Sequence, residues 1–257
     1  MFKMYNNNIL VSVVTPLYNK VNFIEACIES VLLQTHGNWE MIIVDDRSSD
    51  GSYEKVLKFA SRDKRIKVYQ FENNSGAGLA RNFAIEKSVG SFVAFLDSDD
   101  VWHPDKLKIQ LEIMISRKAV FSHTSYGYIL KNGTYSSKIF EVSPGPIGFK
   151  DLLKRTEISC LTAMYDVRVL GKMYMPNISR KQDYALWLSI LSKGHTSLPI
   201  NLVLAWYRQV DGSNSSNKIS LISKHYFFLR RLQNLSVLDS VIYTFYWGFN
   251  GFFRYFF

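Results

Sequence analysis

Short apolar runs alternate with helical patterns along the first part of the chain, and this alternation limits the folds that are open to it. The apolar runs lie at Leu10–Thr15, Trp39–Val44, Arg65–Phe71 and Phe92–Leu96. Between them, apolar residues recur at helical spacing near residues 21–34, 51–61 and 78–88. Apolar strands that alternate with helices form a mostly parallel sheet covered on both faces. We therefore predict an α/β fold.

The pattern is less regular after residue 118. Two strand-like runs at 119–130 and 134–142 flank the turn Lys131-Asn132-Gly133, which predicts a hairpin. The later elements that we expect are a polar helix from Asp151–Arg155, a strand-like segment at Ser159–Tyr165, a helix at Tyr184–Leu191, a strand at Leu202–Arg208 and a closing loop at Asp211–Asn217.

Polar residues follow three of the predicted strands at the point where each strand ends. These ends read Thr15-Pro16-Leu17-Tyr18-Asn19, Asp45-Asp46-Arg47-Ser48 and Asp97-Ser98-Asp99-Asp100. The carboxyl ends of parallel strands meet at one edge of a sheet, and ligands of open α/β sheets bind there. The sequence therefore predicts a single binding site at this edge.

Asp97, Asp99 and Asp100 place three carboxylates within four residues, where they repel one another. Mg²⁺ or Mn²⁺ relieves such repulsion, because these ions bind one or two carboxylates together with phosphate oxygens and water. An alternative is that Asp99 or Asp100 caps the helix that follows Pro104. The position directly after the run Phe92–Leu96 favours the metal.

Two further groups are candidates for contacts with a nucleotide. Asp45 and Asp46 are either turn residues or acceptors for the N3–H of a uracil base. Gly76 and Gly78 allow close approach of backbone to a phosphate at a helix start, and Arg81 offers a charge-assisted hydrogen bond. The glycines imitate a dinucleotide fingerprint, but they follow the third strand and lack the last glycine of that pattern.

Asp183 opens the last predicted helix, where helix capping is its simplest role. It is also a candidate general base, since no histidine is better placed for that work. The histidines show no metal-ligand spacing; they are His36, His103, His123, His195 and His225.

Five segments follow one another in the order VSVVTPLYN, SVLLQTHGNWE, IIVDDRSSDGS, GAGLARNFAI and FLDSDDVWHPDKL. In order and spacing they resemble the inverting glycosyltransferases of family 2, which have the GT-A fold. The resemblance covers roughly residues 10–215 and implies a Rossmann-like central sheet, with a nucleotide-binding half at about 1–118 and an acceptor half at about 119–217. The block ISCLTAMYDVRVLGK followed by RKQDYALWLSI is similar to bacterial O-antigen and related surface-polysaccharide transferases.

This resemblance implies a role for each matching residue on the donor side. Thr15 and Asp46, with Asp45 beside it, would hold the uridine of a UDP-sugar, and Arg81 would lie near the diphosphate. Asp97 would approach the ribose and the metal. The other positions expected to bind the donor are Pro16, Tyr18, Asn19, Gly78 and Ser98.

The resemblance also implies that Asp99 ligates Mn²⁺ or Mg²⁺ and that Asp183 is the general base. The sugar would be a hexose, as in UDP-glucose or UDP-galactose, and the acceptor a saccharide linked to a polyprenyl diphosphate. Two departures from the family pattern stand out. Gln182 replaces the usual glutamate beside the base, and Gln209-Val210-Asp211-Gly212 stands where many members carry a histidine.

The last forty residues, 218–257, form a distinct tail that is rich in aromatic and basic residues and carries a single acid, Asp239. Its uncharged stretch between Asp239 and Arg254 is too short to span a bilayer but suits an interfacial helix. Packing of the tail on the core is the alternative. If the tail is an interfacial helix, the protein would be cytoplasmic and peripheral on the inner face of the cytoplasmic membrane.

The net charge of +9 fits nucleotide phosphates, an anionic membrane or nucleic acid. No nucleic-acid-binding module is recognisable, so we expect no nucleic-acid partner. A nucleotidyltransferase would carry a glycine-rich, arginine-bearing signature after the first strand, where this chain reads TPLYNK. A non-catalytic scaffold that binds a sugar nucleotide is disfavoured because Asp97, Asp99 and Asp183 are all present.

Overall fold

The computed structural model describes residues 8–209 and 218–256. Its strands are β1 (Val11–Leu17), β2 (Trp39–Asp45), β3 (Ile66–Gln70), β4 (Phe92–Phe95), β5 (Val101–Trp102), β6 (Phe121–Ile129), β7 (Tyr135–Phe140), β8 (Met164–Asp166) and β9 (Leu198–Arg208). Its α-helices are α1 (Ile24–Leu32), α2 (Ser52–Ala60), α3 (Ala77–Lys87), α4 (Lys106–Arg117), α5 (Phe149–Lys154), α6 (Val167–Leu170), α7 (Gln182–Ser192), α8 (Lys218–Leu232) and α9 (Val237–Phe256).

All the strands join one sheet in the order β3-β2-β1-β4-β8-β6-β9-β5, and β7 pairs with β6 at the side of this path. The strands β1 to β4 are parallel wherever they pair with one another. Strand β8 runs antiparallel to both β4 and β6, while β6 and β9 are parallel. The α/β fold class is confirmed, and the parallel part of the sheet carries the three polar strand ends.

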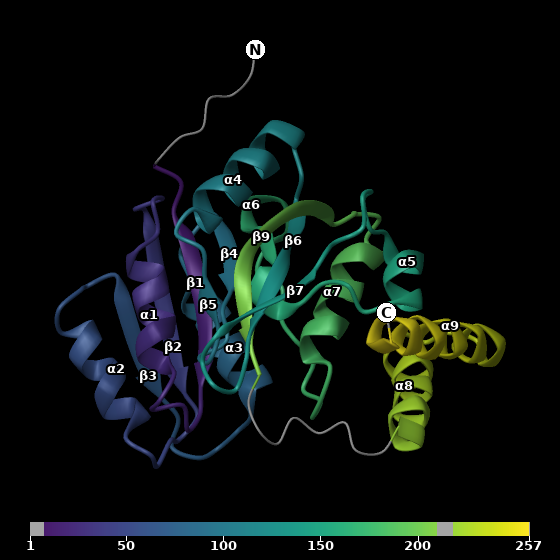
Figure 1. The fold of residues 1–257 in the computed structure, drawn as a ribbon, viewed down its shortest axis with the longest axis horizontal. Coiled ribbons are helices and arrows are strands. Elements are labelled where there is room, and N and C mark those ends of the chain that lie inside the picture. Colours follow the sequence, from purple (N-terminus) through teal and green to yellow (C-terminus); the bar gives the residue numbers. More distant parts are fainter. Residues whose placement is uncertain (1–7, 210–217, 257) are drawn as a thin grey trace.

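The sheet separates two hydrophobic cores, as expected for strands that are buried on both faces. Val11 and Val13 of β1 face the core under α1 and α4, whereas Val14 faces the core under α3 and α7. Successive side chains of a strand point to opposite faces, so both alternate sets must be apolar. Figure 1 shows α1 and α2 on one side of the molecule and α5, α7, α8 and α9 on the other.

Strand β1 does not end before Pro16, as the sequence pattern indicated, but continues to Leu17. Pro16 pairs with Val44 of β2, while the pairing with β4 stops at Val14 and Phe95. Pro16 therefore lies beyond the last residue of β4. An N–H at position 16 would point toward the β4 side of β1, so the N–H that proline lacks is not needed there. This extension carries the polar strand end Thr15–Asn19 further toward the site.

Other differences concern short elements. Val101–Trp102 forms strand β5, which was not predicted because it is only two residues long. The segment predicted as strand at 159–165 is instead a 3-10 turn, Cys160–Thr162, followed by β8. The hairpin turn is confirmed: the N–H of Gly133 donates to the carbonyl of Leu130 at 2.8 Å. The expected loop at 211–217 lies outside the described residues.

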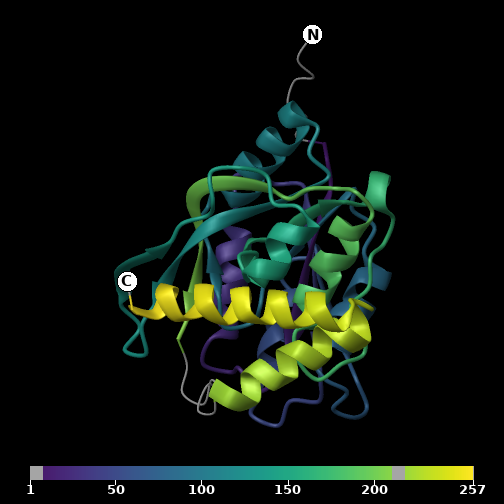
Figure 2. The ribbon, with the colours of Figure 1, turned by 90° about the vertical axis from the view of Figure 1, so that its right-hand side faces the viewer.

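The two C-terminal helices cross each other on the flank formed by α5 and α7 (Figure 2). One side of the pair is packed against the core, with His225 and Leu229 fully buried and Phe228 nearly so. Trp247 donates from its indole N–H to Oγ1 of Thr156 at 2.9 Å. The opposite side leaves large apolar side chains in the open. Within the described residues, no helix is both long and apolar enough to cross a membrane.

Candidate active site

A cavity of about 250 Å³ lies at the carboxyl ends of β1, β2 and β4. Most of the residues singled out in the sequence line it, and they come from segments far apart in the chain. The lining residues that the sequence predicted are Pro16, Tyr18, Asp46, Arg81, Asp97, Ser98 and Asp99. Leu17, Lys20 and Ala77 complete the lining. The three polar strand ends therefore meet, as predicted.

Two ion pairs cross this cavity. Nη2 of Arg81, from α3, lies 2.5 Å from Oδ1 of Asp97, and Nζ of Lys20 lies 2.7 Å from Oδ2 of Asp99. Burial alone would lower the pKa of Arg81, but the carboxylate of Asp97 raises it instead. The guanidinium is therefore permanently charged, and its buried Nε has no hydrogen-bond partner among the described residues. The charge of the guanidinium at the cavity wall, rather than the buried Nε, is what can attract an anionic oxygen.

Asp100 has a structural role that separates it from its two neighbours. Its Oδ1 accepts a hydrogen bond from the backbone N–H of Arg208 at 2.8 Å, and Nε of Arg208 donates to the carbonyl of Asp99 at 2.8 Å. These bonds tie the loop after β4 to the end of β9. Burial, then Asp99 and Asp97, raise the pKa of Asp100 well above its usual range. Neither Asp99 nor Asp100 caps α4, whose N-cap is Asp105.

The two aspartates at the end of β2 differ in what they bind. The carboxylate of Asp46 accepts the backbone N–H groups of Ser75 and Gly76 at 2.6 and 2.8 Å, which anchors the start of α3 beside the cavity. Asp45 lies deeper and accepts from Ser48 N–H at 3.1 Å with one oxygen. Its other oxygen, Oδ1, is buried without a partner among the described residues.

Thr15, within β1, and Asn19, just after it, lie at different depths in the site. Oγ1 of Thr15 is buried without a hydrogen-bond partner in the described part of the chain, so Thr15 lies below the cavity surface. Asn19 instead joins the loops around the site. Its Oδ1 accepts the N–H of Ser49 at 2.9 Å, and its own N–H donates to Oγ of Ser48 at 3.0 Å. Asn19 therefore fixes the polar end of β1 to that of β2.

Gly78 contacts the first turn of α7 rather than the cavity. A Cβ atom at this position would lie 3.0 Å from Cγ of Gln182, so the absence of a side chain lets α7 approach α3. The glycine therefore has a packing role between α3 and α7. Gln182, the departure from the family pattern, sits directly against it. This contact brings the first turn of α7 to the helix that carries Arg81.

Asp183 follows in that first turn. It lies within electrostatic reach of Arg81 and Asp97, although it does not line the cavity itself. Burial raises the pKa of the Asp183 carboxyl above its ordinary value, while the Arg81 guanidinium acts in the opposite direction. A carboxylate with a raised pKa is a stronger proton acceptor than an ordinary aspartate. The arrangement thus places a basic oxygen beside a cationic, anion-binding group.

The carboxylate oxygens in the cavity fit a hard divalent cation. Asp97 and Asp99 line one cavity and each has a carboxylate oxygen outside the ion pairs described above. Across residues 8–209 and 218–256, no three acidic, histidine or cysteine side chains are grouped to hold a metal. Mg²⁺ and Mn²⁺ do not need three, because phosphate oxygens and water complete their shell. Two aspartates are the set expected for an ion that binds together with a nucleotide diphosphate.

Lys20 and Arg208 are the site residues that sequence reasoning missed. Lys20 directly follows Asn19, so its place at a polar strand end was a usable signal. Arg208 ends β9, which is distant in sequence from Asp99 and runs in the less regular half of the chain. Only the pairing of β6 with β9 and of β9 with β5 brings it to the site.

Solved structures similar to this one support the fold. Staphylococcus aureus TarS, residues 1–349 in complex with UDP-GlcNAc, superposes with a TM-score of 0.67 over 90% of this chain and 69% of the TarS chain, at 21% identity. The GT-A type of fold implied by the sequence is therefore confirmed.

Two similar proteins of known sequence cover nearly the whole chain. TuaG of Bacillus subtilis, a glycosyltransferase whose name assigns it to teichuronic acid biosynthesis, is 47% identical over 92% of this chain and 94% of its own length. The Escherichia coli enzyme UDP-Glc:alpha-D-GlcNAc-diphosphoundecaprenol beta-1,3-glucosyltransferase WfgD is 39% identical over 84% of each chain. The profile of glycosyl transferase family 2 matches residues 12–172, more than half of the sequence. The chain belongs to glycosyl transferase family 2.

Proposed function

We propose that this enzyme transfers a hexose from a UDP-sugar to a saccharide carried on a lipid diphosphate, with inversion at the anomeric carbon, in bacterial surface-polysaccharide biosynthesis. The observation that carries the proposal is the grouping of Arg81, Asp97 and Asp99 around one cavity with Asp183 in electrostatic reach. Of the similar proteins, WfgD is named for UDP-glucose and a diphosphoundecaprenol-linked acceptor. UDP-glucose is accordingly the first donor to test.

On the donor side, Asp46 and the segment Pro16–Asn19 would hold the uridine, with Thr15 and Asp45 supporting them from below. Arg81 would bind the diphosphate with its charged guanidinium, which lines the cavity. Ser98 and the glycines at the start of α3 complete the donor contacts in this proposal. The nucleotide-binding half would then be about 1–118 and the acceptor half about 119–217.

Asp97 and Asp99 would hold Mn²⁺ or Mg²⁺. When bound, such an ion neutralises charge that develops on the leaving diphosphate. The residues of the chain do the remaining work. Asp183 accepts the proton of the acceptor hydroxyl as that oxygen attacks the anomeric carbon. UDP leaves from the opposite face and Arg81 stabilises its charge. A single displacement converts an α-linked donor into a β-linked product.

A donor screen tests this proposal directly. Purified protein with Mn²⁺ would be given UDP-glucose, UDP-galactose, UDP-GlcNAc, GDP-mannose or dTDP-glucose with a synthetic GlcNAc-diphosphate-lipid acceptor, and the products analysed by mass spectrometry. We expect one UDP-hexose to be transferred, with loss of transfer in EDTA and in Asp99→Ala. Transfer from a GDP- or dTDP-sugar alone would overturn the donor assignment. A failure to bind UDP in calorimetry, with no transfer from any donor, would overturn the transferase assignment.

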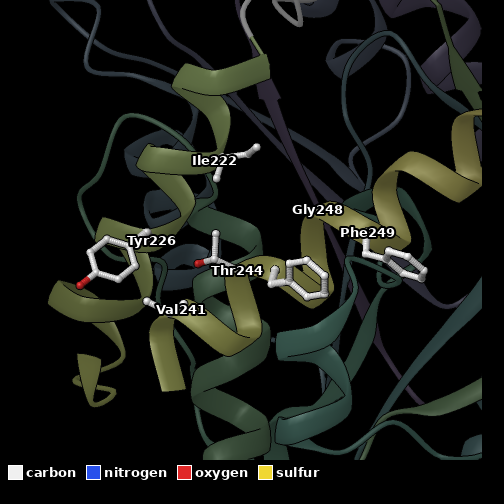
Figure 3. Close-up of a pocket in the computed structure, with 7 residues that line it drawn as sticks. Ile222, Tyr226, Val241, Thr244, Gly248 and Phe249 are labelled. Atoms are coloured by element: carbon white, nitrogen blue, oxygen red, sulfur yellow. The ribbon is translucent and has the colours of Figure 1, made fainter. Parts of the chain in front are cut away.

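We further propose that α8 and α9 attach the enzyme to the cytoplasmic membrane surface, where such an acceptor is found. Their outer side carries exposed apolar residues, including Leu238 at 69%, Phe245 at 68% and Phe249 at 51% of full exposure. An apolar groove of about 690 Å³ runs along this side (Figure 3). It is lined by Ile222, Tyr226, Val241, Thr244, Phe245, Gly248 and Phe249.

The charges next to this apolar side suit an anionic lipid surface. Lys224 and Arg231 are exposed on α8, and Lys154 of α5 extends its ammonium to within 5.7 Å of the Tyr246 ring. Apolar side chains with flanking cations are typical of interfacial helices. Since the inner side of the pair is packed on the core, the two predictions for the tail, core packing and lipid attachment, are compatible.

Co-sedimentation with vesicles tests the attachment. We expect binding to vesicles that contain phosphatidylglycerol, weaker binding to pure phosphatidylcholine, and loss of binding in Phe245→Ser/Phe249→Ser. Val89→Ser is the matched control, because Val89 is an apolar residue with 70% exposure elsewhere on the surface. Equal sedimentation of the double variant and the control would contradict the attachment.

A further inference from the structure

Lys181 lies where α7, the helix that carries Asp183, meets the C-terminal helices α8 and α9. It is the N-cap residue of α7, two positions before Asp183, and its carbonyl accepts the N–H of Ala185 at 2.9 Å, the first hydrogen bond of the helix. Its backbone is left-handed, with φ of +62°. A residue with a side chain adopts this conformation at a cost of about 1 kcal/mol, so other contacts must hold Lys181 in place.

Those contacts come from the side chain, which enters a cage built mainly by the C-terminal helices. Nζ lies 2.5 Å from Nδ1 of His225 in α8 and 4.3 Å from the ring centroid of Trp247 in α9. The rings of Phe228 and Tyr184 lie 5.6 and 5.9 Å away. Distances below about 6 Å from an ammonium to an aromatic face give a favourable cation–π interaction.

The protonation states agree with this geometry. Burial and then the neighbouring ammonium lower the pKa of His225 to about 3, so the imidazole is neutral and its Nδ1 accepts a hydrogen bond. Burial lowers the pKa of Lys181 only to about 8, so the amine still carries its proton at neutral pH. His225 also stacks on Trp247, with centroids 4.2 Å apart, which closes the cage from the outside.

Lys181 is joined to the active site by the two residues that follow it. The next residue, Gln182, packs against Gly78 of α3, and the one after it is Asp183. Helix α3 also carries Arg81, which is paired with Asp97. A shift at Lys181 would therefore move the first turn of α7 relative to the donor-binding residues. The C-terminal helices thus contact the turn that carries Asp183 through Lys181, and also through Tyr184, whose ring centroid lies 5.4 Å from that of Phe228.

We propose that Lys181 is a positioning residue for the general base: its ammonium, held by His225 and Trp247, fixes the turn that carries Asp183, so that α8 and α9 form part of the acceptor half of the active site. The inference rests on the proposed role of Asp183. The C-terminal helices would then have two roles, attachment to the membrane surface and positioning of the base. Both roles serve an acceptor that is carried on a lipid.

The test compares Lys181→Met, which keeps the aliphatic stem, with Lys181→Arg, which keeps a cation in the cage. Lys193→Met is the matched control, since Lys193 is an exposed lysine at the other end of α7. We expect Lys181→Met to lower kcat for sugar transfer by about tenfold or more, the scale of a misplaced catalytic group. UDP binding in calorimetry should stay unchanged, Lys181→Arg should recover most of the rate, and Lys193→Met should equal the wild type.

The outcomes separate this inference from the proposed function. A wild-type kcat in Lys181→Met, while Asp183→Asn is inactive, overturns the positioning role and leaves the proposed function intact. Full activity of Asp183→Asn overturns the proposed base and the inference with it. Loss of UDP binding in Lys181→Met also contradicts the inference, because the cage would then serve the fold as a whole. If Lys181→Met does not fold, Trp247→Leu opens the cage from its outer side and carries the same expectations.

Discussion

The ammonium of Lys20 lies 2.7 Å from Oδ2 of Asp99, so a lysine that follows β1 is paired with the aspartate that we assign to the metal. A cation at this distance repels a divalent ion that binds the same carboxylate. We expect Lys20→Met to bind Mn²⁺ severalfold more tightly than the wild type when nucleotide is absent, as measured by calorimetry. Lys55→Met, which removes the surface pair with Glu25, should leave Mn²⁺ binding unchanged. Weaker binding in Lys20→Met would contradict this assignment.

The contact between Gly78 and Gln182 gives a second prediction. In an isolated helix, alanine is favoured over glycine by about 1 kcal/mol, so Gly78→Ala should not unfold α3. Its Cβ would nevertheless meet Cγ of Gln182 at 3.0 Å, so the side chain of Gln182 in the first turn of α7 would have to shift by a few tenths of an ångström. We expect a lower kcat for transfer. The double variant Gly78→Ala/Gln182→Ala should recover the rate, because alanine at 182 makes room for the methyl group; additive losses in the double variant would contradict the packing role.

Much of the site could be predicted because its residues follow strands whose apolar character is strong. Runs such as Phe92–Leu96 fix both the strand and the edge at which Asp97 and Asp99 emerge. Arg208 could not be identified in the same way, since its hydrogen bonds to the loop after β4 depend on tertiary contacts. Lys181 was equally hidden, because three residues of its cage, His225, Phe228 and Trp247, are more than forty positions away in sequence.

The parts of the fold that differ from prediction are short or lie where two halves of the sheet join. A two-residue strand such as β5 has no hydrophobic period to detect and forms only because Trp102 pairs with Ala205 of β9. The 3-10 turn at Cys160–Thr162 replaces a predicted strand, since its apolar residues pack between β4 and β6 without joining a ladder. In both places tertiary packing decides the local structure.

The pH dependence of transfer gives a third prediction. Because burial raises the pKa of Asp183, the acid limb of a kcat/KM profile should lie above about 3.9, the value for an unperturbed aspartate. Activity is present above this pKa and is lost as the pH falls through it. The same shift means that the charged form costs stability at neutral pH. Asp183→Asn should therefore raise the unfolding temperature while it abolishes transfer; a lower unfolding temperature would contradict the burial argument.

Lys106 provides a fourth prediction, on stability. It is fully buried in α4, where Nζ donates to Oε1 of Gln110 at 2.7 Å, and burial lowers its pKa to about 7. The unfolded chain, with a lysine pKa near 10.4, binds more protons between about pH 7 and 10, so stability from this residue rises with pH in that window. We expect thermal unfolding of Lys106→Met to lack this rise relative to the wild type.

Lys108→Met is the control for that measurement, because Lys108 lies in the same helix with an exposed side chain. Its unfolding temperature should follow the wild-type curve from pH 7 to about 10, whatever other groups titrate in this range. Parallel curves for Lys106→Met and the wild type would show that the lysine is charged when the protein is folded.

The role of Asp183 as the base is the central claim, and a single comparison tests it most directly. Transfer from UDP-glucose with Mn²⁺ would be measured for the wild type and Asp183→Asn, with UDP binding measured in parallel by calorimetry. We predict that Asp183→Asn binds UDP as the wild type does, transfers sugar at least about a hundredfold more slowly, and that the wild-type product is β-linked by NMR. A wild-type rate in Asp183→Asn, or an α-linked product, would contradict the account.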